Sequence, residues 1–304
     1  PEGLKPIEPF EVTIKDEGVT LKGIYKEDKL ILSPITVVKV DASTGKVIPV
    51  ANTEFRLLDE NKKPITMTTY YPNKVVHETF KTDENGQFTF PEKLKYGTYY
   101  LEELHAPEGY LKGELLTFKV TEGSTWEKPL VVQYADENAM GKIQIQKTDA
   151  ETKTALANAV FEITAAEDII TPDGTVRLQK GEIADTITTD DAGNAESKNL
   201  FLGKYFVKEK QQPDGYLLNE KKYEVELKYK DQNTTLITES LDITNQPTKV
   251  EVVKTDKETG KPIEGVEFSV WNKAMFEDTT DQIGVKETFA TDKDGKITLK
   301  YLVP

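Results

Sequence analysis

The sequence contains no cysteine, which excludes disulfides, thiolate metal sites and cysteine nucleophiles. Its two histidines, His77 and His105, lie far apart and form no HExxH-type pair. No transmembrane run, signal peptide or sorting motif is recognisable. We therefore expect no metal, no cofactor and no histidine-based catalysis, and an enzyme such as a glycosidase lacks a distinctive pair of carboxylates.

Positive charge is also scarce. The 39 lysines and arginines are outnumbered by 53 aspartates and glutamates, which gives a net charge of -14. Such a chain repels phosphate backbones and anionic lipids, so nucleic-acid binding and membrane insertion are not expected. A mean hydropathy of -0.53 indicates a soluble chain, and 304 residues allow two or three domains.

What the sequence does have is an internal repeat. A Lys-x-Asp phrase recurs at nearly equal intervals, at Lys39, Lys147 and Lys254. A small-x-x-Phe step and then a Thr-Asp-x-x-Gly phrase follow each lysine. The second phrase stands at residues 82–86, 189–193 and 291–295. Asp bonds its own backbone and Gly tolerates positive φ, so this phrase predicts a β-turn rather than a calcium loop, whose ligand spacing it lacks.

A third phrase fixes the limits of the repeats. It runs from a Gly-x-Tyr segment to Pro-x-Gly-Tyr, over residues 97–110 and 203–216, and Pro1–Gly3 fits its Pro-x-Gly step. We therefore divide the chain into residues 1–34, the tail of an upstream β-repeat; 35–140 and 141–247, two complete domains; and 248–304, the front of a third, truncated domain. The linkers at 139–140 and 246–248 are too short for free tumbling.

Short alternating runs of Val, Ile, Tyr, Phe and Thr occupy the space between these phrases, separated by Gly, Asn, Asp and Pro. This pattern is typical of β-strands, and no long segment has helical periodicity. Regular turns in repeats of this length suit a β-sandwich. The sequence thus predicts an all-β chain of tandem sandwiches.

Three polar residues of the second repeat share strand faces with apolar residues. Residues two apart in a strand point to the same side, so Lys147 lies on the face of Ile143 and Ile145. By the same rule Glu209 and Asn245 lie on apolar faces of their own strands. We expect Lys147, Glu209 and Asn245 to meet in one core.

The first repeat offers a corresponding set. Lys39 and Glu103 follow from the same phrases, and Asn138 precedes the next lysine by as many residues as Asn245 does. The spacing therefore favours Asn138 as the third member. Asp136 shares the predicted face of Asn138 and remains an alternative.

Such a trio has a distinctive chemistry. Burial lowers the pKa of a lysine and raises that of a glutamate, so the pair tends toward a neutral amine and a neutral acid. A neutral amine is a nucleophile, and a protonated carboxyl can polarise an amide and move protons. The product is an isopeptide bond, formed once per domain with loss of ammonia. The alternatives are a buried Lys–Glu ion pair or exposed edge-strand lysines.

These phrases resemble the Cna protein B-type domains, also called SpaA-type or prealbumin-like domains, of Gram-positive surface proteins and pilins. The shared pattern is a first-strand lysine before x-Asp, a glutamate before Pro-x-Gly-Tyr, and a last-strand Asn or Asp. The resemblance implies tandem immunoglobulin-like or prealbumin-like sandwiches with self-formed bonds. It assigns Lys39 to Asn138 with Glu103 assisting, and Lys147 to Asn245 with Glu209 assisting. Lys254 has no such partners within this sequence and is expected to remain a free amine.

The resemblance implies a structural stalk or shaft that is secreted and attached to the cell wall, with neighbouring domains of the same surface protein as its partners. The alternative is an adhesin module that recognises host extracellular matrix. For that function the long insert from about Asn61 to Thr79, with two adjacent tyrosines, is the candidate surface.

Overall fold

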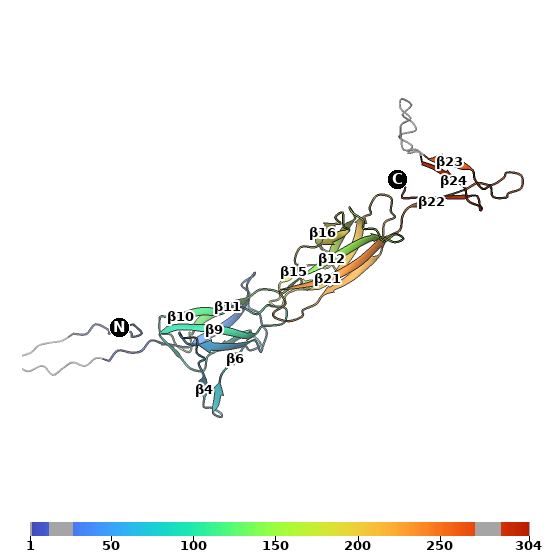
Figure 1. Ribbon diagram of the computed structural model, residues 1–304. Helices are drawn as coiled ribbons and strands as arrows, with labels where there is room; N and C mark the ends of the chain where they lie inside the picture. The colour runs from blue at the N-terminus through green and yellow to red at the C-terminus, as the bar shows by residue number, and fades with distance from the viewer. Residues whose placement is uncertain (1, 12–26, 271–286, 304) are drawn as a thin grey trace, which may run out of the picture.

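The structure, a computed structural model, describes residues 2–11, 27–270 and 287–303. These residues form strands and turns without any helix, so none of them offers a helix able to cross a membrane. Figure 1 shows two β-sandwiches arranged end to end, followed by smaller β-sheets near the C-terminus. The prediction of an all-β chain of tandem sandwiches is confirmed.

The first sandwich consists of two sheets around one apolar core. Its main strands are β2 (Ile35–Asp41), β3 (Glu54–Leu58), β6 (Phe80–Lys81), β7 (Gln87–Thr89), β9 (Gly97–His105), β10 (Leu116–Val120) and β11 (Leu130–Asp136). One sheet has the order β11-β2-β7 and the other β10-β9-β3-β6. Phe55, Leu57, Leu101 and Tyr134 pack in the core between them.

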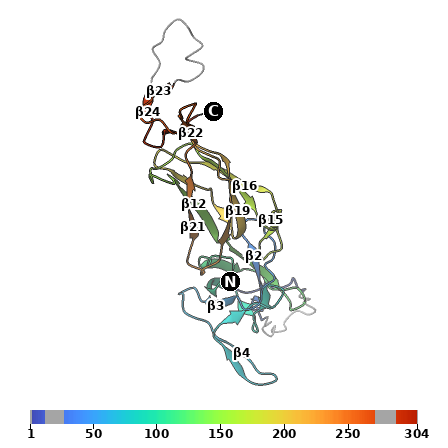
Figure 2. The same ribbon diagram turned by 90° about the vertical axis from the view of Figure 1, so that its right-hand side faces the viewer.

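Two short strand pairs complete the first sandwich. β1 (Leu32–Ser33) pairs with β8 (Leu94–Lys95), and β4 (Met67–Thr69) pairs with β5 (Val75–His77). The β4–β5 hairpin lies within the predicted insert and projects away from the body of the sandwich (Figures 1 and 2).

The second sandwich repeats this plan. Its strands are β12 (Met140–Asp149), β13 (Val160–Ala165), β14 (Ile169–Ile170), β15 (Val176–Leu178), β16 (Ile183–Thr188), β17 (Asn194–Glu196), β18 (Leu200–Phe201), β19 (Gly203–Gln211), β20 (Lys222–Leu227) and β21 (Leu236–Asn245). β12 pairs with β17, β18 and β21, and the facing sheet has the order β16-β13-β19-β20. β14 and β15 form a separate hairpin.

The first and last strands of each sandwich lie side by side and run parallel. In the first sandwich the facing pairs include Lys39–Tyr134 and Asp41–Asp136. In the second sandwich the corresponding pairs are Lys147–Ile243 and Asp149–Asn245. This shared register makes Asp136 the structural equivalent of Asn245.

The face assigned to Lys147 is confirmed. Ile143, Ile145 and Lys147 are buried on β12, whereas Gln144 between them is exposed. The lysine therefore extends into the core with its apolar neighbours, as the period-two rule requires.

The predicted turn phrase positions this lysine. Asp190 caps its own turn by accepting hydrogen bonds from the backbone NH groups of Ala192 and Asn194. Gly193, at φ 74°, accepts a 2.7 Å hydrogen bond from the backbone NH of Lys147. Gly86 accepts the equivalent 2.9 Å bond in the first sandwich. The turn phrase is thus confirmed and acts as a backbone support for the first strand.

Gly193→Ala should destabilise the second sandwich by about 1–3 kcal/mol, because alanine is strained at positive φ. Its Cβ would also lie 2.4 Å from the carbonyl oxygen of Lys147. Gly181→Ala is the matched control, since its φ is 84° but nothing lies within 4 Å of an added Cβ. Denaturant unfolding of both variants isolates the cost of the close approach, and equal losses would contradict the proposed support.

The residues after the second sandwich form two small sheets. β22 (Lys249–Val253) pairs with β25 (Lys296–Lys300), and β23 (Glu267–Val270) pairs with β24 (Glu287–Ala290). Lys254 follows β22 directly. At the other end of the chain, Leu4 and Leu30 form an isolated bridge ahead of β1.

Candidate functional site

The structure brings Lys147, Glu209 and Asn245 together in the core of the second sandwich, where each is at most 1% exposed. The Lys147 Nζ donates a hydrogen bond to Asn245 Oδ1 and lies 3.2 Å from Glu209 Oε1. The Asn245 Nδ2 donates to both Glu209 oxygens at 3.0 Å. The glutamate therefore contacts both the nucleophile and the amide nitrogen.

Both sheets contribute to this trio. Lys147 and Asn245 lie on the parallel strands β12 and β21, while Glu209 lies on β19 of the facing sheet, opposite Phe161 of β13. The Phe161 ring centre lies 5.5 Å from the lysine Nζ. Glu209 Oε2 accepts a 2.6 Å hydrogen bond from the backbone NH of Asn219, which fixes its orientation.

Burial lowers the pKa of Lys147, and the negative charge of Glu209 only partly opposes this effect. The core therefore favours the neutral amine more than water does. A neutral amine beside an amide carbonyl is arranged for nucleophilic attack.

The first sandwich contains an equivalent trio of Lys39, Glu103 and Asp136. All three are buried, and the Lys39 Nζ contacts Asp136 Oδ1 and lies 3.4 Å from Glu103 Oε1. The Tyr134 ring centre is 4.6 Å from the Nζ. Glu103 Oε2 accepts a 2.7 Å hydrogen bond from the backbone NH of Gly113.

Asn138 is not part of this trio, so the spacing argument that favoured it was wrong. Its Nδ2 donates a 2.7 Å hydrogen bond to Asp41 Oδ2, beyond the end of β11. Asp136 and Asn245 each end the last strand of their domain, and the following linkers are equally long. However, β12 begins two residues further ahead of Lys147 than β22 begins ahead of Lys254. Counting back from the lysine therefore overshoots Asp136.

Asp136 is held in the acid form. Burial raises its pKa to about 8, and the charge of Glu103 adds to this effect, while Lys39 opposes it. Among the described residues, no backbone NH or hydroxyl donates a hydrogen bond to either Asp136 oxygen. A buried carboxylate without such donors is costly, so the neutral acid is favoured near pH 7.

The sequence gave no warning of the backbone donors that orient the two glutamates. Gly113 and Asn219 each follow their glutamate by 10 residues, just after the Pro-x-Gly-Tyr phrase. This equal offset is the signal that would have found them. The phrase thus places a backbone NH against the glutamate.

Lys254 lies outside any trio. It is half-buried, and its Nζ makes no hydrogen bond or ion pair to residues in the described ranges. That it remains a free amine stays a prediction.

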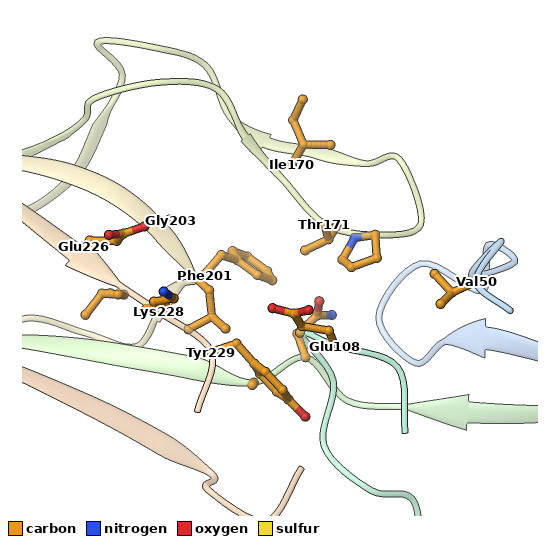
Figure 3. Close-up of a pocket in the computed structure, with 15 residues that line it drawn as sticks. Val50, Glu108, Ile170, Thr171, Phe201, Gly203, Glu226, Lys228 and Tyr229 are labelled. Atoms are coloured by element: carbon orange, nitrogen blue, oxygen red, sulfur yellow. The ribbon is translucent and has the colours of Figure 1, made fainter. Parts of the chain in front are cut away.

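A groove of about 610 Å³ lies between the two sandwiches. Figure 3 shows Phe201, Thr171 and Tyr229 of the second sandwich on one side and Val50 of the first on the other. Neither bond lysine nor either glutamate of the trios lines it. The groove therefore belongs to the junction, while the reactive groups lie in the closed cores.

These features define a tandem array of β-sandwiches with a repeated buried Lys–Glu–Asx trio. The model of the SpaA family, described as a prealbumin-like fold domain, matches residues 33–131, 141–241 and 248–304. The chain belongs to this family.

Solved structures show the same fold. The Bacillus anthracis TIE protein is 22% identical with a TM-score of 0.57, and the match covers 90% of this chain and 44% of that chain. The chain thus spans less than half of that relative. The shaft pilin SpaA from Lactobacillus rhamnosus GG is 17% identical over 71% of this chain and 98% of its own, with a TM-score of 0.29. Comparison with curated proteins gave no match.

Proposed function

We propose that this chain is part of the load-bearing shaft of a Gram-positive cell-surface protein or pilin. In this proposal each complete sandwich joins its first and last strands by an isopeptide bond, Lys39 to Asp136 and Lys147 to Asn245. The observation that carries it is the buried trio, repeated in two successive domains with the same strand register. The cell-wall location and the neighbouring domains as partners follow from this proposal.

In the second sandwich the Lys147 Nζ attacks Cγ of Asn245 as a neutral amine. The amine proton passes to Glu209 Oε1, 3.2 Å away, and Glu209 then protonates the Asn245 Nδ2 at 3.0 Å. The C–N bond to Nδ2 breaks and ammonia leaves, so the glutamate is regenerated. The reaction consumes its own lysine and asparagine, and the chain is therefore not an enzyme.

In the first sandwich the same steps use a carboxylic acid. The Lys39 Nζ attacks Cγ of protonated Asp136, and Glu103 carries the proton from the amine to the departing hydroxyl. Water leaves instead of ammonia. An ionised carboxylate would not accept the amine, which is why the raised pKa of Asp136 matters.

A covalent link between adjacent parallel strands changes how the domain carries load. Tension entering β12 would cross to β21 through the bond and bypass the residues between Lys147 and Asn245. The bond would also reduce the conformational freedom of the unfolded chain, as a disulfide does. This suits a chain without cysteine.

Intact-mass measurement tests the chemistry. We expect the protein to be lighter than its sequence by one ammonia and one water, and an unchanged mass would overturn the proposal. Single-molecule stretching tests the mechanics. Without its bond, the second sandwich should release a step on the order of 300 Å, because Lys147 and Asn245 are 98 positions apart and each residue extends by about 3.3–3.6 Å. The intact protein should show no such step.

The two bonds should respond to pH in opposite directions. Burial lowers the pKa of Lys147, and raising the pH increases its neutral fraction, so ammonia release should accelerate until that pKa is passed. The pKa of Asp136 is about 8. Above it the reactive acid falls about tenfold per pH unit, so water release should slow.

This pH response is measured on chain kept in denaturant from synthesis and then refolded by dilution at pH 6 to 10. Peptide masses at successive times give the two rates separately. Parallel pH profiles in the two domains would contradict the different protonation requirements.

A second candidate function, an adhesive module, is favoured by the β4–β5 hairpin. Met67 is buried at its base, while Tyr70 and Tyr71 at its tip are 75% and 91% exposed. Exposed aromatic residues of this kind often form the centre of a protein-binding surface. Tyr70→Ser/Tyr71→Ser should abolish solid-phase binding to collagen or fibrinogen, with Tyr96→Ser as the control. If the unaltered protein does not bind, this candidate is abandoned.

A further inference from the structure

The aspartate two residues after the bond lysine is buried at the junction between the two sandwiches. Asp41 Oδ1 caps its own turn by accepting from the backbone NH groups of Ser43 and Thr44, at 2.8 and 2.9 Å. Its Oδ2 accepts from Tyr110 and Asn138 of the same sandwich, at 3.0 and 2.7 Å. The carboxylate is thus fully engaged within its own domain on one side.

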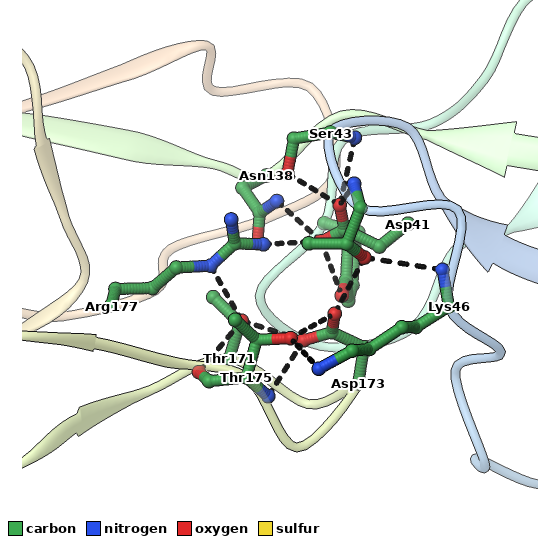
Figure 4. A network of polar contacts seen from close by, with 10 residues as sticks. Asp41, Ser43, Lys46, Asn138, Thr171, Asp173, Thr175 and Arg177 are labelled. Carbon is green, nitrogen blue, oxygen red and sulfur yellow. Dashed lines mark hydrogen bonds and ion pairs between the residues drawn. The ribbon is translucent and has the colours of Figure 1, made fainter.

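The remaining donor to Asp41 comes from the next domain. Arg177 of β15 donates from its Nη2 to Asp41 Oδ2 at 2.9 Å (Figure 4). The guanidinium is itself held, because its Nε donates to Thr171 at 2.9 Å and it lies 4.5 Å from the Phe201 ring centre. A buried, charge-assisted contact of this kind has a defined geometry.

Burial alone would raise the pKa of Asp41. Hydrogen bonds from Ser43, Asn138 and Tyr110 outweigh that effect and hold its pKa well below the usual range. The carboxylate that faces Arg177 is therefore charged throughout the neutral range.

Two smaller contacts flank the Arg177 pair. Thr44 donates to Asp173 Oδ2 at 2.8 Å, and the Lys46 Nζ donates to Thr175 at 3.0 Å. Figure 4 shows these side chains converging from the β14–β15 hairpin of one domain and the turn after β2 of the other.

A second loop grips the first sandwich elsewhere. The Gln232 side chain donates from Nε2 to the Leu104 carbonyl at 3.1 Å and accepts at Oε1 from the Ala106 backbone NH at 2.8 Å. Its own carbonyl accepts from the Lys112 NH at 2.9 Å. Two separated loops of the second domain therefore hold the end of the first.

The next junction uses the same aspartate position. Asp149 Oδ1 caps its turn through the NH groups of Glu151 and Thr152. Its Oδ2 accepts from Tyr216 of its own domain at 2.9 Å and from Tyr301 of the following residues at 3.1 Å. The donor differs from Arg177 but the acceptor position is identical.

We propose that the end of each sandwich is a docking surface for the next domain, built around the Lys-x-Asp aspartate. This carboxylate accepts a guanidinium or phenol donor from the following domain, and with the second loop it fixes the angle between them. The proposal does not depend on the isopeptide bonds. It assigns a role to the aspartate of the repeated phrase, which the bond chemistry does not use.

Residual dipolar couplings test this directly on the full chain. In the unaltered protein, couplings from 35–136 and 141–245 should fit a single alignment tensor. Arg177→Met/Gln232→Ala should require two different tensors. Each domain's couplings should still fit its own structure, which separates loss of docking from loss of folding.

The matched control is Arg56→Met/Gln144→Ala, which removes an arginine–carboxylate contact and a glutamine contact outside the junction. It should retain the single tensor. The proposal is overturned if the unaltered protein already needs two tensors, or if the junction variant keeps one.

Discussion

In Glu209→Ala, Lys147 and Asn245 should remain unjoined, and the protein should be heavier by one ammonia than expected from this substitution alone in the bonded chain. The glutamate is the group within 3.2 Å of the nucleophile and 3.0 Å of the leaving nitrogen, so without it no side chain of the trio moves the proton. The second sandwich should also lose about 4–5 kcal/mol of unfolding free energy. That is the entropic value of closing a loop of about 100 residues. Intact mass and denaturant unfolding give the two readouts.

Three further variants define the result. Glu209→Gln keeps the shape of the side chain but cannot shuttle the proton in the same way, and it should stay folded and unbonded. Glu103→Ala should remove only the water loss of the first sandwich. Glu224→Ala, an exposed glutamate on β20, should change neither readout. Ammonia loss that persists in both Glu209 variants would exclude the glutamate-assisted mechanism.

The trio of the second sandwich was predictable because parity along a strand is a local rule. Alternation placed Lys147, Glu209 and Asn245 on apolar faces, and a sandwich has one core for those faces to share. The all-β fold and the turn phrases followed from equally local signals, namely the alternating runs and the Asp and Gly positions. Each of these depends on residues close together in the sequence.

The first sandwich shows where such rules stop. Parity allows both Asp136 and Asn138, and their choice depends on where β11 ends, which no single residue specifies. Strand ends are set by pairing with a distant segment, here β2. Counting from Lys39 within its own domain falls on Glu137, between the two candidates, and so could not decide either.

The junction could not be predicted at all. Arg177 and Asp41 are 136 positions apart and belong to different domains. Arg177 lies on a three-residue strand whose sequence carries no periodic pattern. Only the packed arrangement of the two sandwiches brings them together.

Asp136→Ala should abolish the bond of the first sandwich, whereas Asn138→Ala should preserve it. The register pairs Asp136 with Asp41 as it pairs Asn245 with Asp149, and the Lys39 Nζ contacts Asp136. Loss of the bond should cost about 4–5 kcal/mol, because it closes a loop nearly as long as that of the second sandwich. Asn138→Ala removes a hydrogen bond to a charged group, so its cost should be about 1.5–3 kcal/mol with the water loss intact.

Asp136→Asn provides the sharpest check, because it should keep the bond and change the leaving group. The amide nitrogen would leave as ammonia, so the bonded product would have the same mass as the unaltered protein while the unbonded chain would not. Fragmentation of the cross-linked peptide then locates the bond at residue 136 or residue 138. A bond to Asn138 in the unaltered protein would show that β11 ends differently from the described register, and would restore the assignment favoured by spacing alone.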